Sequence, residues 1–275
     1  MSTGSPPKRG FSTQAVHAGE DRKKFGDSLT TPIVQTSTFV FHDAKDVHDY
    51  TSKAKFRFEY SRYGTPTQRT TEKKLAELDG AQDCLLFASG MSAVTTALLA
   101  LLSKGQHLVI TDDVYKKTLQ FCQNDLPRFG IECAITPMGD YQALEKAIQP
   151  NTRILFSESP TNPYLNILDM KKFVAIGKKH RLTTIVDATF ATPVNQQPLA
   201  FGVDIVIHSA TKYLGGHNDL LAGAALGKER FVNEVRDFQK TTGGVIDPHC
   251  CYLLLRGLKT LFIRVARQNA TALTV

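Results

Sequence analysis

From residue 66 onward, short apolar segments alternate with longer segments of helical periodicity, and this alternation limits the possible folds more than any other feature. It predicts strands at 83–88, 107–111, 131–136, 153–157, 183–187, 204–208 and 222–226. It predicts helices at 67–78, 91–102, 116–129, 141–148 and 170–180, most of them followed by Gly or Pro, with Pro127 kinking the last turn of the segment 116–129. Strands separated by helices indicate an α/β fold in which a mostly parallel sheet carries helices on both faces.

Both ends of the chain depart from this alternation. Residues 1–65 are rich in Ser, Thr and Asp, and we expect an extended N-terminal arm with short helices. We assign residues 66–248 to one large domain. From residue 249 to the end, apolar residues recur at helical spacing, which predicts one long helix. No Gly or Pro follows that helix, so we expect residues 249–275 to be the start of a long interdomain helix whose C-terminal small domain is absent.

Composition argues against several other classes of protein. The net charge of +7 fits either solvated lysines or a preference for anionic ligands, but no Lys/Arg run is interleaved with aromatic residues, so we expect no nucleic-acid partner. The longest apolar stretch is too short for a bilayer and residues 1–9 lack a signal-peptide core, so we expect no membrane association. Five cysteines without CxxC spacing indicate a reducing compartment, and we expect the cytoplasm. The histidines form no HxxxH or HExxH pair, so we expect no metal site.

A lysine with two hydroxyl neighbours follows one of the predicted strands. Ser209 and Thr211 come directly after the strand 204–208, and Lys212 is next. Two hydroxyls can bind a phosphate while the amine reaches the same ligand. A capped turn beside a solvated lysine explains these residues equally well.

Three further predicted strands end in residues suited to a ligand. Ser89, Gly90 and Met91 join a strand to a helix, whose first N–H groups favour an anion, although an ordinary capped turn has the same sequence. Asp187 ends a buried strand, and its charge needs a partner, either a backbone N–H or a protonated heterocyclic nitrogen. Tyr115 follows a third strand and can stack on a flat ring or lie in a partly exposed loop.

Together these residues offer an amine, a carboxylate, a stacking aromatic and a phosphate cup at the strand ends of one sheet, where ligands bind in such folds. Pyridoxal phosphate (PLP) requires this combination, because its ring withdraws electrons best when its nitrogen is protonated. No GxGxxG or GxxxxGKS run supports a nicotinamide or nucleoside triphosphate.

Several ordered segments resemble the Cys/Met-metabolism family of PLP-dependent enzymes, which includes cystathionine γ-synthase, the cystathionine lyases and methionine γ-lyase. The segments are EYSRYGTPT (59–67), ASGM (88–91), ESPTNP (158–163), VD (186–187), SATKY (209–213) and GGH (215–217). The resemblance runs from residue 13 to the end of the chain. It implies the seven-stranded large domain of aspartate-aminotransferase-like enzymes, in a dimer or tetramer.

The resemblance also implies roles for individual residues. The covalent link to PLP would be made by Lys212, the contact with its ring nitrogen by Asp187 and the ring stacking by Tyr115. Its remaining cofactor contacts would be Ser89, Gly90, Met91, Asn162, Ser209 and Thr211, with Tyr60 and Arg62 reaching the phosphate of a neighbouring subunit. Two residues are candidate substrate contacts: Glu59 for a distal ammonium and Lys117 for an acidic leaving group, although Lys117 also fits the start of a helix.

The run 115–118 is most similar to plant-type cystathionine γ-synthases, since methionine γ-lyases have a cysteine at the position of Lys117. The implied reaction is γ-replacement, in which the thiol of cysteine displaces the activating group of an activated homoserine and gives cystathionine. The alternatives are a cystathionine γ-lyase or related C–S lyase, and a truncated PLP-binding subunit with impaired activity.

Overall fold

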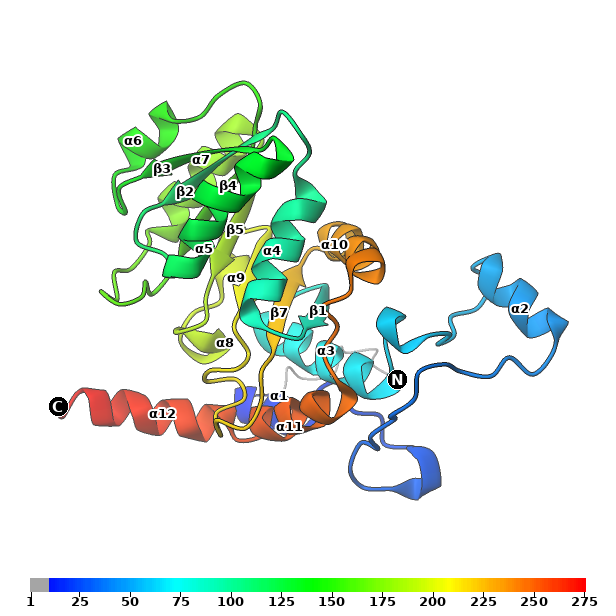
Figure 1. Ribbon diagram of the computed structural model, residues 1–275. Coiled ribbons are helices and arrows are strands. Elements are labelled where there is room, and N and C mark those ends of the chain that lie inside the picture. Colours follow the sequence, from blue (N-terminus) through cyan, green and yellow to red (C-terminus); the bar gives the residue numbers. More distant parts are fainter. Residues whose placement is uncertain (1–9) are drawn as a thin grey trace, which may run out of the picture.

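A computed structural model describes residues 10–275 and places a seven-stranded sheet at the centre of the molecule (Figure 1). The strand order is β1-β7-β6-β5-β4-β2-β3. The strands are β1 (Asp83–Phe87), β2 (His107–Thr111), β3 (Glu132–Thr136), β4 (Thr152–Glu158), β5 (Thr183–Asp187), β6 (Ile205–His208) and β7 (Gly223–Gly227). Only β7 runs antiparallel to its neighbours, so the predicted mostly parallel sheet is confirmed.

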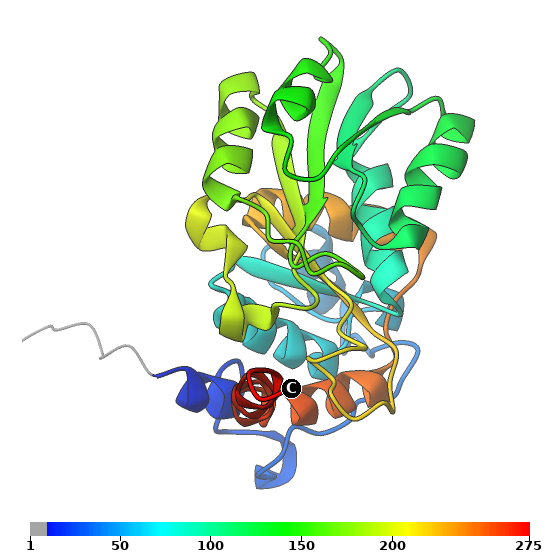
Figure 2. The same cartoon turned by 90° about the vertical axis from the view of Figure 1, so that its left-hand side faces the viewer.

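Helices cover both faces of this sheet, as the alternation predicts (Figure 2). The helices of the body are α3 (Pro66–Asp79), α4 (Gly90–Leu101), α5 (Lys116–Gln120), α6 (Tyr141–Lys146), α7 (Met170–His180), α8 (Thr192–Asn195), α9 (Pro198–Phe201), α10 (Glu229–Thr242), α11 (Pro248–Leu258) and α12 (Leu261–Ala272). Successive strand residues point to opposite faces. In β1, Leu85 and Phe87 pack with α4 and α10, whereas Cys84 and Leu86 pack with α3 and α11.

The predicted helix 116–129 is regular α-helix only at its start, and the kink expected at Pro127 falls in an irregular last turn. Helix α5 ends at Gln120 and continues as a π-helical turn, η3 (Phe121–Asp125), and a 3₁₀ turn, η4 (Leu126–Phe129). Pro127 has no N–H to donate to the residue four positions earlier, so regular α-helix cannot continue through it. The segment ends at Gly130, whose φ of +71° is left-handed.

Two further differences concern the C-terminal third of the chain. Helix α10 was not predicted, because its buried residues (Val232, Val235 and Gln239) are few among many polar ones. The one long helix expected from residue 249 is two helices, α11 and α12. Thr260 leaves helical geometry at φ −106° and ψ 3°, and its N–H bonds to the carbonyl of Gly257 in a tighter turn.

The arm before residue 66 contains little regular structure. Its elements are α1 (Phe11–His17), η1 (Phe25–Asp27), α2 (Ala44–Thr51) and η2 (Ser61–Tyr63), with one β-bridge between Thr38 and Tyr60. Helix α2 lies well away from the sheet (Figure 1). The domain boundaries after residues 65 and 248 stay predictions. The expectations for residues 1–9 lie outside the described residues.

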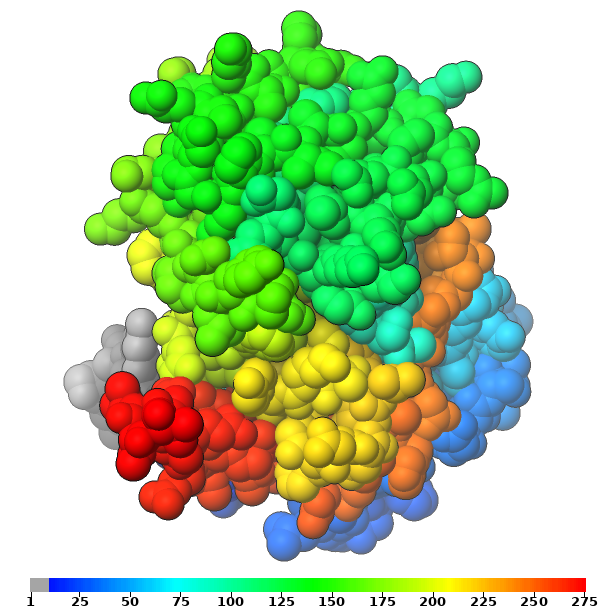
Figure 3. Space-filling view, turned by 60° about the vertical axis from the view of Figure 1, so that its left-hand side comes forward, coloured from blue at the N-terminus to red at the C-terminus, as the bar shows by residue number. Residues whose placement is uncertain are grey.

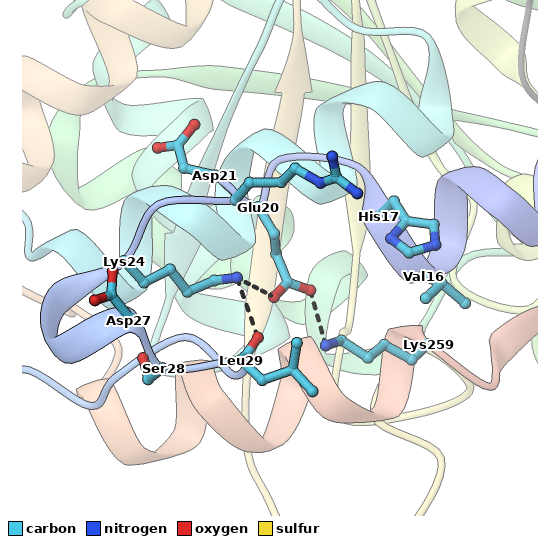
Figure 4. A pocket seen from close by; sticks show the side chains of 10 residues that line it. Val16, His17, Glu20, Asp21, Lys24, Asp27, Ser28, Leu29 and Lys259 are labelled. Atoms are coloured by element: carbon cyan, nitrogen blue, oxygen red, sulfur yellow. Dashed lines mark hydrogen bonds and ion pairs between the residues drawn. The ribbon is translucent and has the colours of Figure 1, made fainter.

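A buried lysine anchors the start of this arm to the body. Lys74 of α3 is fully buried and donates to the carbonyls of Ala15 and Val16 at 3.0 and 2.9 Å. Its ammonium lies 3.4 Å from Glu20, which also pairs with Lys259 at 2.9 Å (Figure 4). Burial lowers the pKa of Lys74 to about 8, against the opposing attraction of Glu20. These contacts fix the arm where it crosses α3 and α11.

No helix among the described residues is both long and apolar enough to cross a membrane.

Candidate active site

A cavity of about 480 Å³ opens at the edge where β4, β5 and β6 end. It is lined by Ser89, Gly90, Met91, Val94, Tyr115, Thr118, Glu158, Asn162, Asp187, Thr189, Phe190, Ser209, Thr211, Lys212 and Leu221. The loop after β6 (yellow in Figure 3) lies on the surface between the C-terminal helices and the segments coloured green. The cavity therefore occupies the carboxyl edge of the sheet, where α/β proteins bind their ligands.

A second hollow, of about 870 Å³, lies between the arm and α11 (Figure 4). Its central carboxylate, Glu20, pairs with Lys24, Lys74 and Lys259. Because Glu20 is already paired with lysines and the hollow is not at the strand ends, the hollow is a poor candidate for the site of chemistry.

The parallel strands bring Asp187 and Lys212 to the same cavity. Asp187 is the last residue of β5, and its backbone lies beside Ile207 of β6. Lys212 follows β6 by four residues, in a turn where its N–H bonds to the carbonyl of Ser209. Both side chains line the cavity.

The Asp187 carboxylate is buried and held at one of its two oxygens. Thr189 donates its N–H and its hydroxyl to Oδ1 of Asp187, at 2.9 and 2.5 Å. Burial raises the pKa of Asp187, and these two hydrogen bonds oppose that shift. Among the described residues no donor contacts Oδ2, which is therefore available to a protonated ring nitrogen.

Helix α4 presents its N-terminus to the cavity. Ser89 caps the helix by accepting a hydrogen bond from the N–H of Ser92 at 3.1 Å. The N–H groups of Gly90 and Met91, in the first turn, have no intrahelical partner, and the helix dipole favours an anion beside them. A Cβ on Gly90 would lie 2.7 Å from Cβ of Ser209, so glycine is required for this close approach.

The hydroxyl of Thr211 is engaged by the backbone of Ala222. It donates to the Ala222 carbonyl at 3.1 Å and accepts the Ala222 N–H at 2.9 Å. These bonds hold the loop after β6 closed. They also occupy the hydroxyl proton, so Thr211 would donate to a phosphate only by giving up its bond to Ala222.

Tyr115 and Asn162 line the cavity as well. Tyr115 is 43% exposed and precedes α5, and its backbone N–H donates to Oε2 of Glu158 at 2.6 Å. This bond fixes the backbone that carries the aromatic ring.

Four of the predicted site residues do not line this cavity: Tyr60, Arg62, Glu59 and Lys117. Arg62 lies over the ring of Tyr60 and donates to the carbonyl of Lys240. The prediction that Tyr60 and Arg62 serve a neighbouring subunit stays a prediction.

The two candidate substrate contacts are placed elsewhere. Glu59 accepts the hydroxyl of Tyr50 at 2.7 Å. Burial, together with this acceptor, raises the pKa of Tyr50 to about 12. Lys117 lies exposed on α5. Within this chain, therefore, neither side chain faces the candidate site.

Three polar residues that line the cavity were not among the predicted site residues, namely Thr118, Glu158 and Thr189. Thr189 follows Asp187 at the spacing of an Asx turn, in which an Asp side chain accepts the N–H two residues on, and this was an available signal. Glu158 ends β4 beside Asp187, and only the pairing of β4 with β5 brings the two carboxyl groups together.

The cavity fits PLP on these observations. The free Oδ2 of Asp187 suits the ring nitrogen, the first turn of α4 suits the phosphate, and Lys212 supplies the amine. Because Gly90 has no side chain, Ser209 packs directly against the first turn of α4 at the edge of the same cavity. Tyr115 supplies an aromatic face at the same cavity.

Comparison with known proteins agrees with this fit. A family model for Cys/Met metabolism PLP-dependent enzymes matches residues 12–275. The chloroplastic cystathionine gamma-synthase 1 of Nicotiana tabacum is 45% identical over 94% of this chain and 48% of that protein. L-methionine gamma-lyase of Pseudomonas putida is 38% identical over 98% of this chain and 68% of that protein.

A crystal structure of metB from Corynebacterium glutamicum has the same fold, with a TM-score of 0.87 and 32% identity over 94% of this chain and 66% of that one. The chain spans about half the length of the plant relative. Because the family model covers nearly all of the chain, this protein belongs to the Cys/Met metabolism family of PLP-dependent enzymes.

Proposed function

We propose that the chain binds PLP through Lys212 and catalyses a γ-replacement of the cystathionine γ-synthase type. In this reaction the thiol of cysteine displaces the activating group of an activated homoserine and cystathionine forms. The observation that carries the proposal is that Lys212 and Asp187, which are distant in sequence, line one cavity beside the N-terminus of α4. The 45% identity to a plant cystathionine gamma-synthase supports the choice of reaction.

When bound, PLP supplies an electron-withdrawing ring that weakens the bonds at the α-carbon of an amino acid. The Asp187 carboxylate would keep the ring nitrogen protonated, and Thr189 would orient that carboxylate. The first-turn N–H groups of α4 would hold the phosphate. The Lys212 amine would accept the proton that leaves the substrate α-carbon and return a proton later, as a general base and acid.

A second candidate is the elimination of a C–S bond by a lyase of the same family. It is supported by the 38% identity to a methionine gamma-lyase, of which the chain covers 68%. The position of Lys117 favours neither reaction, because its side chain lies exposed on α5 and outside the cavity.

A panel of substrates separates these candidates. The purified chain, saturated with PLP, is incubated with cysteine and O-phospho-, O-succinyl- or O-acetylhomoserine, and cystathionine is measured. Parallel reactions with cystathionine or methionine alone are assayed for the keto acid that elimination releases. Cystathionine as the main product supports the γ-synthase, and keto acid as the main product overturns it in favour of the lyase. Cofactor binding without either product supports the third candidate, a PLP-binding subunit without turnover.

A further inference from the structure

Two carboxyl groups lie side by side at the bottom of the candidate site. Glu158 ends β4 and Asp187 ends β5, and the two residues are direct partners in the parallel ladder. Both are buried, with 4% and 8% of their surface exposed. Two carboxylates this close in a buried site cannot both ionise cheaply, so such a pair retains one proton near neutral pH.

The surroundings of the pair are unequal. Asp187 accepts two hydrogen bonds from Thr189. The charge of His208, the last residue of β6, also favours the anionic form of Asp187. Glu158 accepts one hydrogen bond, from the N–H of Tyr115, and faces a second anion, Asp113, in the loop after β2.

Nearby cations do little to stabilise a negative charge on Glu158. Of the described residues that line the cavity, Lys212 alone carries a cationic side chain. No ion pair between it and Glu158 occurs in the described part of the chain. The negative charge is therefore better accommodated on Asp187 and the proton on Glu158.

We propose that Glu158 is a positioning residue that carries the shared proton of the Glu158–Asp187 pair, so that Asp187 stays anionic toward the cofactor ring nitrogen while Glu158 holds the backbone of Tyr115. The Oε2 atom of Glu158 accepts the Tyr115 N–H, which leaves Oε1 to carry the proton. The half of this proposal that concerns the ring nitrogen rests on the proposed function, whereas the shared proton does not.

The titration of Glu158 predicts how the stability of the chain changes with pH. Burial first, and the neighbouring Asp187 second, raise the pKa of Glu158 to about 8. In the unfolded chain a Glu side chain has a pKa of about 4.3. Between these values the folded chain holds a proton that the unfolded chain has lost. The contribution of Glu158 to stability is therefore present at low pH and is lost as the pH rises toward 8.

Glutamine is the matching substitution, because it keeps the acceptor for Tyr115 and cannot titrate. We compare the melting temperatures of wild type and Glu158→Gln, first without PLP, at about pH 5.5 and about pH 8.5. The wild type should lose about 4 °C or more relative to the variant over this range. Glu234→Gln, at an exposed position of α10, is the control and should follow the wild type at both pH values.

Adding PLP tests the other half of the proposal. A cationic ring nitrogen beside Asp187 reduces the repulsion within the pair, so saturation with PLP should move the titration of Glu158 to lower pH. If the titration is present without PLP and PLP does not move it, the placement of the ring nitrogen is overturned and the shared proton stands.

A constant difference in melting temperature at all pH values, without PLP, would overturn the shared proton. That result would not bear on whether Lys212 binds PLP, and it would leave the proposed function untouched. If Glu158→Gln does not fold, infrared titration of the wild-type chain decides the question. The C=O stretching band of a protonated carboxyl group should persist at neutral pH and disappear at about pH 8. Absence of this band at neutral pH contradicts the proposal.

Discussion

Thr189 donates both its backbone N–H and its hydroxyl to the same oxygen of Asp187, at 2.9 and 2.5 Å. The Thr189 hydroxyl also accepts the N–H of Ser209 at 2.7 Å. One side chain thus connects the end of β5, which carries the carboxylate, with the residue after β6, which leads to Lys212. Hydrogen bonds through Thr189 therefore fix the position of Asp187 relative to Ser209, three residues before Lys212.

Replacing Thr189 with valine should therefore weaken both the site and the fold. The variant keeps the side-chain volume but loses the hydroxyl, so we expect PLP to bind about tenfold more weakly and stability to fall by about 1–3 kcal/mol. Titration with PLP, followed by visible absorbance, and denaturant unfolding measure the two effects. Thr189→Ser retains the hydroxyl and should recover most of the affinity; equal loss in both variants would contradict the role of the hydroxyl.

Gly90→Ala should weaken both folding and cofactor binding. The added Cβ would meet Cβ of Ser209 at 2.7 Å, and the helix α4 would have to shift away from the cavity. We expect a loss of about 1–3 kcal/mol in the free energy of unfolding, the usual cost of overpacking. In Gly10→Ala the new Cβ has nothing within 4 Å and the backbone φ is −61°, so this control should stay close to wild type. A Gly90 variant as stable as the control would show that the contact is easily relieved.

The buried pair of His208 and Asp79 gives a prediction for pH dependence. The two side chains lie 2.9 Å apart and are fully buried. Burial alone would lower the pKa of His208, but the attraction of Asp79 prevails and raises it. The stability that this pair contributes is therefore complete below about pH 6.5, the titration point of an unfolded His, and declines as the pH rises through the higher folded pKa.

His208→Gln should destabilise the chain by about 3–5 kcal/mol, because it leaves the Asp79 carboxylate buried without its charged partner. Unfolding in denaturant at about pH 6 and about pH 9 checks the sign, since the difference from wild type should be larger at the lower pH. A difference that grows with pH would mean that His208 is neutral in the folded chain.

Tyr60 and Arg62 lead to a prediction about assembly. Both come from the arm and neither lines the cavity of its own chain. If Arg62 completes the site of a neighbouring copy, then Arg62→Ala and Lys212→Ala chains, inactive alone, should complement each other when they are mixed. Random pairing into dimers would restore roughly a quarter of the complete sites, and hence of the wild-type activity. If Arg62 acts only within its own chain, no site is restored.

Most of the fold could be predicted from the sequence, because it depends on local patterns. Each of the seven strands is found within one residue of its predicted limits, and Gly80 and Gly130 end helical segments as expected. Helix α10 was missed because few of its residues are buried, and two other errors arise where local chemistry interrupts a pattern. Pro127 breaks the helix that begins at Lys116, and a tight turn at Thr260 divides the C-terminal helix.

The site could be predicted in part for a similar reason. Residues that follow single strands, such as Asp187 and Lys212, are visible in the order of the chain. The pairing of Glu158 with Asp187 is not visible in that order, because it depends on which strands are neighbours and in which register. Likewise, the engagement of Thr211 with Ala222 depends on how the loop after β6 closes.

Borohydride reduction shows directly whether Lys212 forms the covalent link to PLP. The chain is incubated with PLP, reduced, digested and analysed by mass spectrometry. A phosphopyridoxyl group should appear on the peptide that contains Lys212, and no such label should appear in Lys212→Ala. Labelling of another lysine at wild-type stoichiometry, or undiminished labelling of the Lys212→Ala chain, would contradict it.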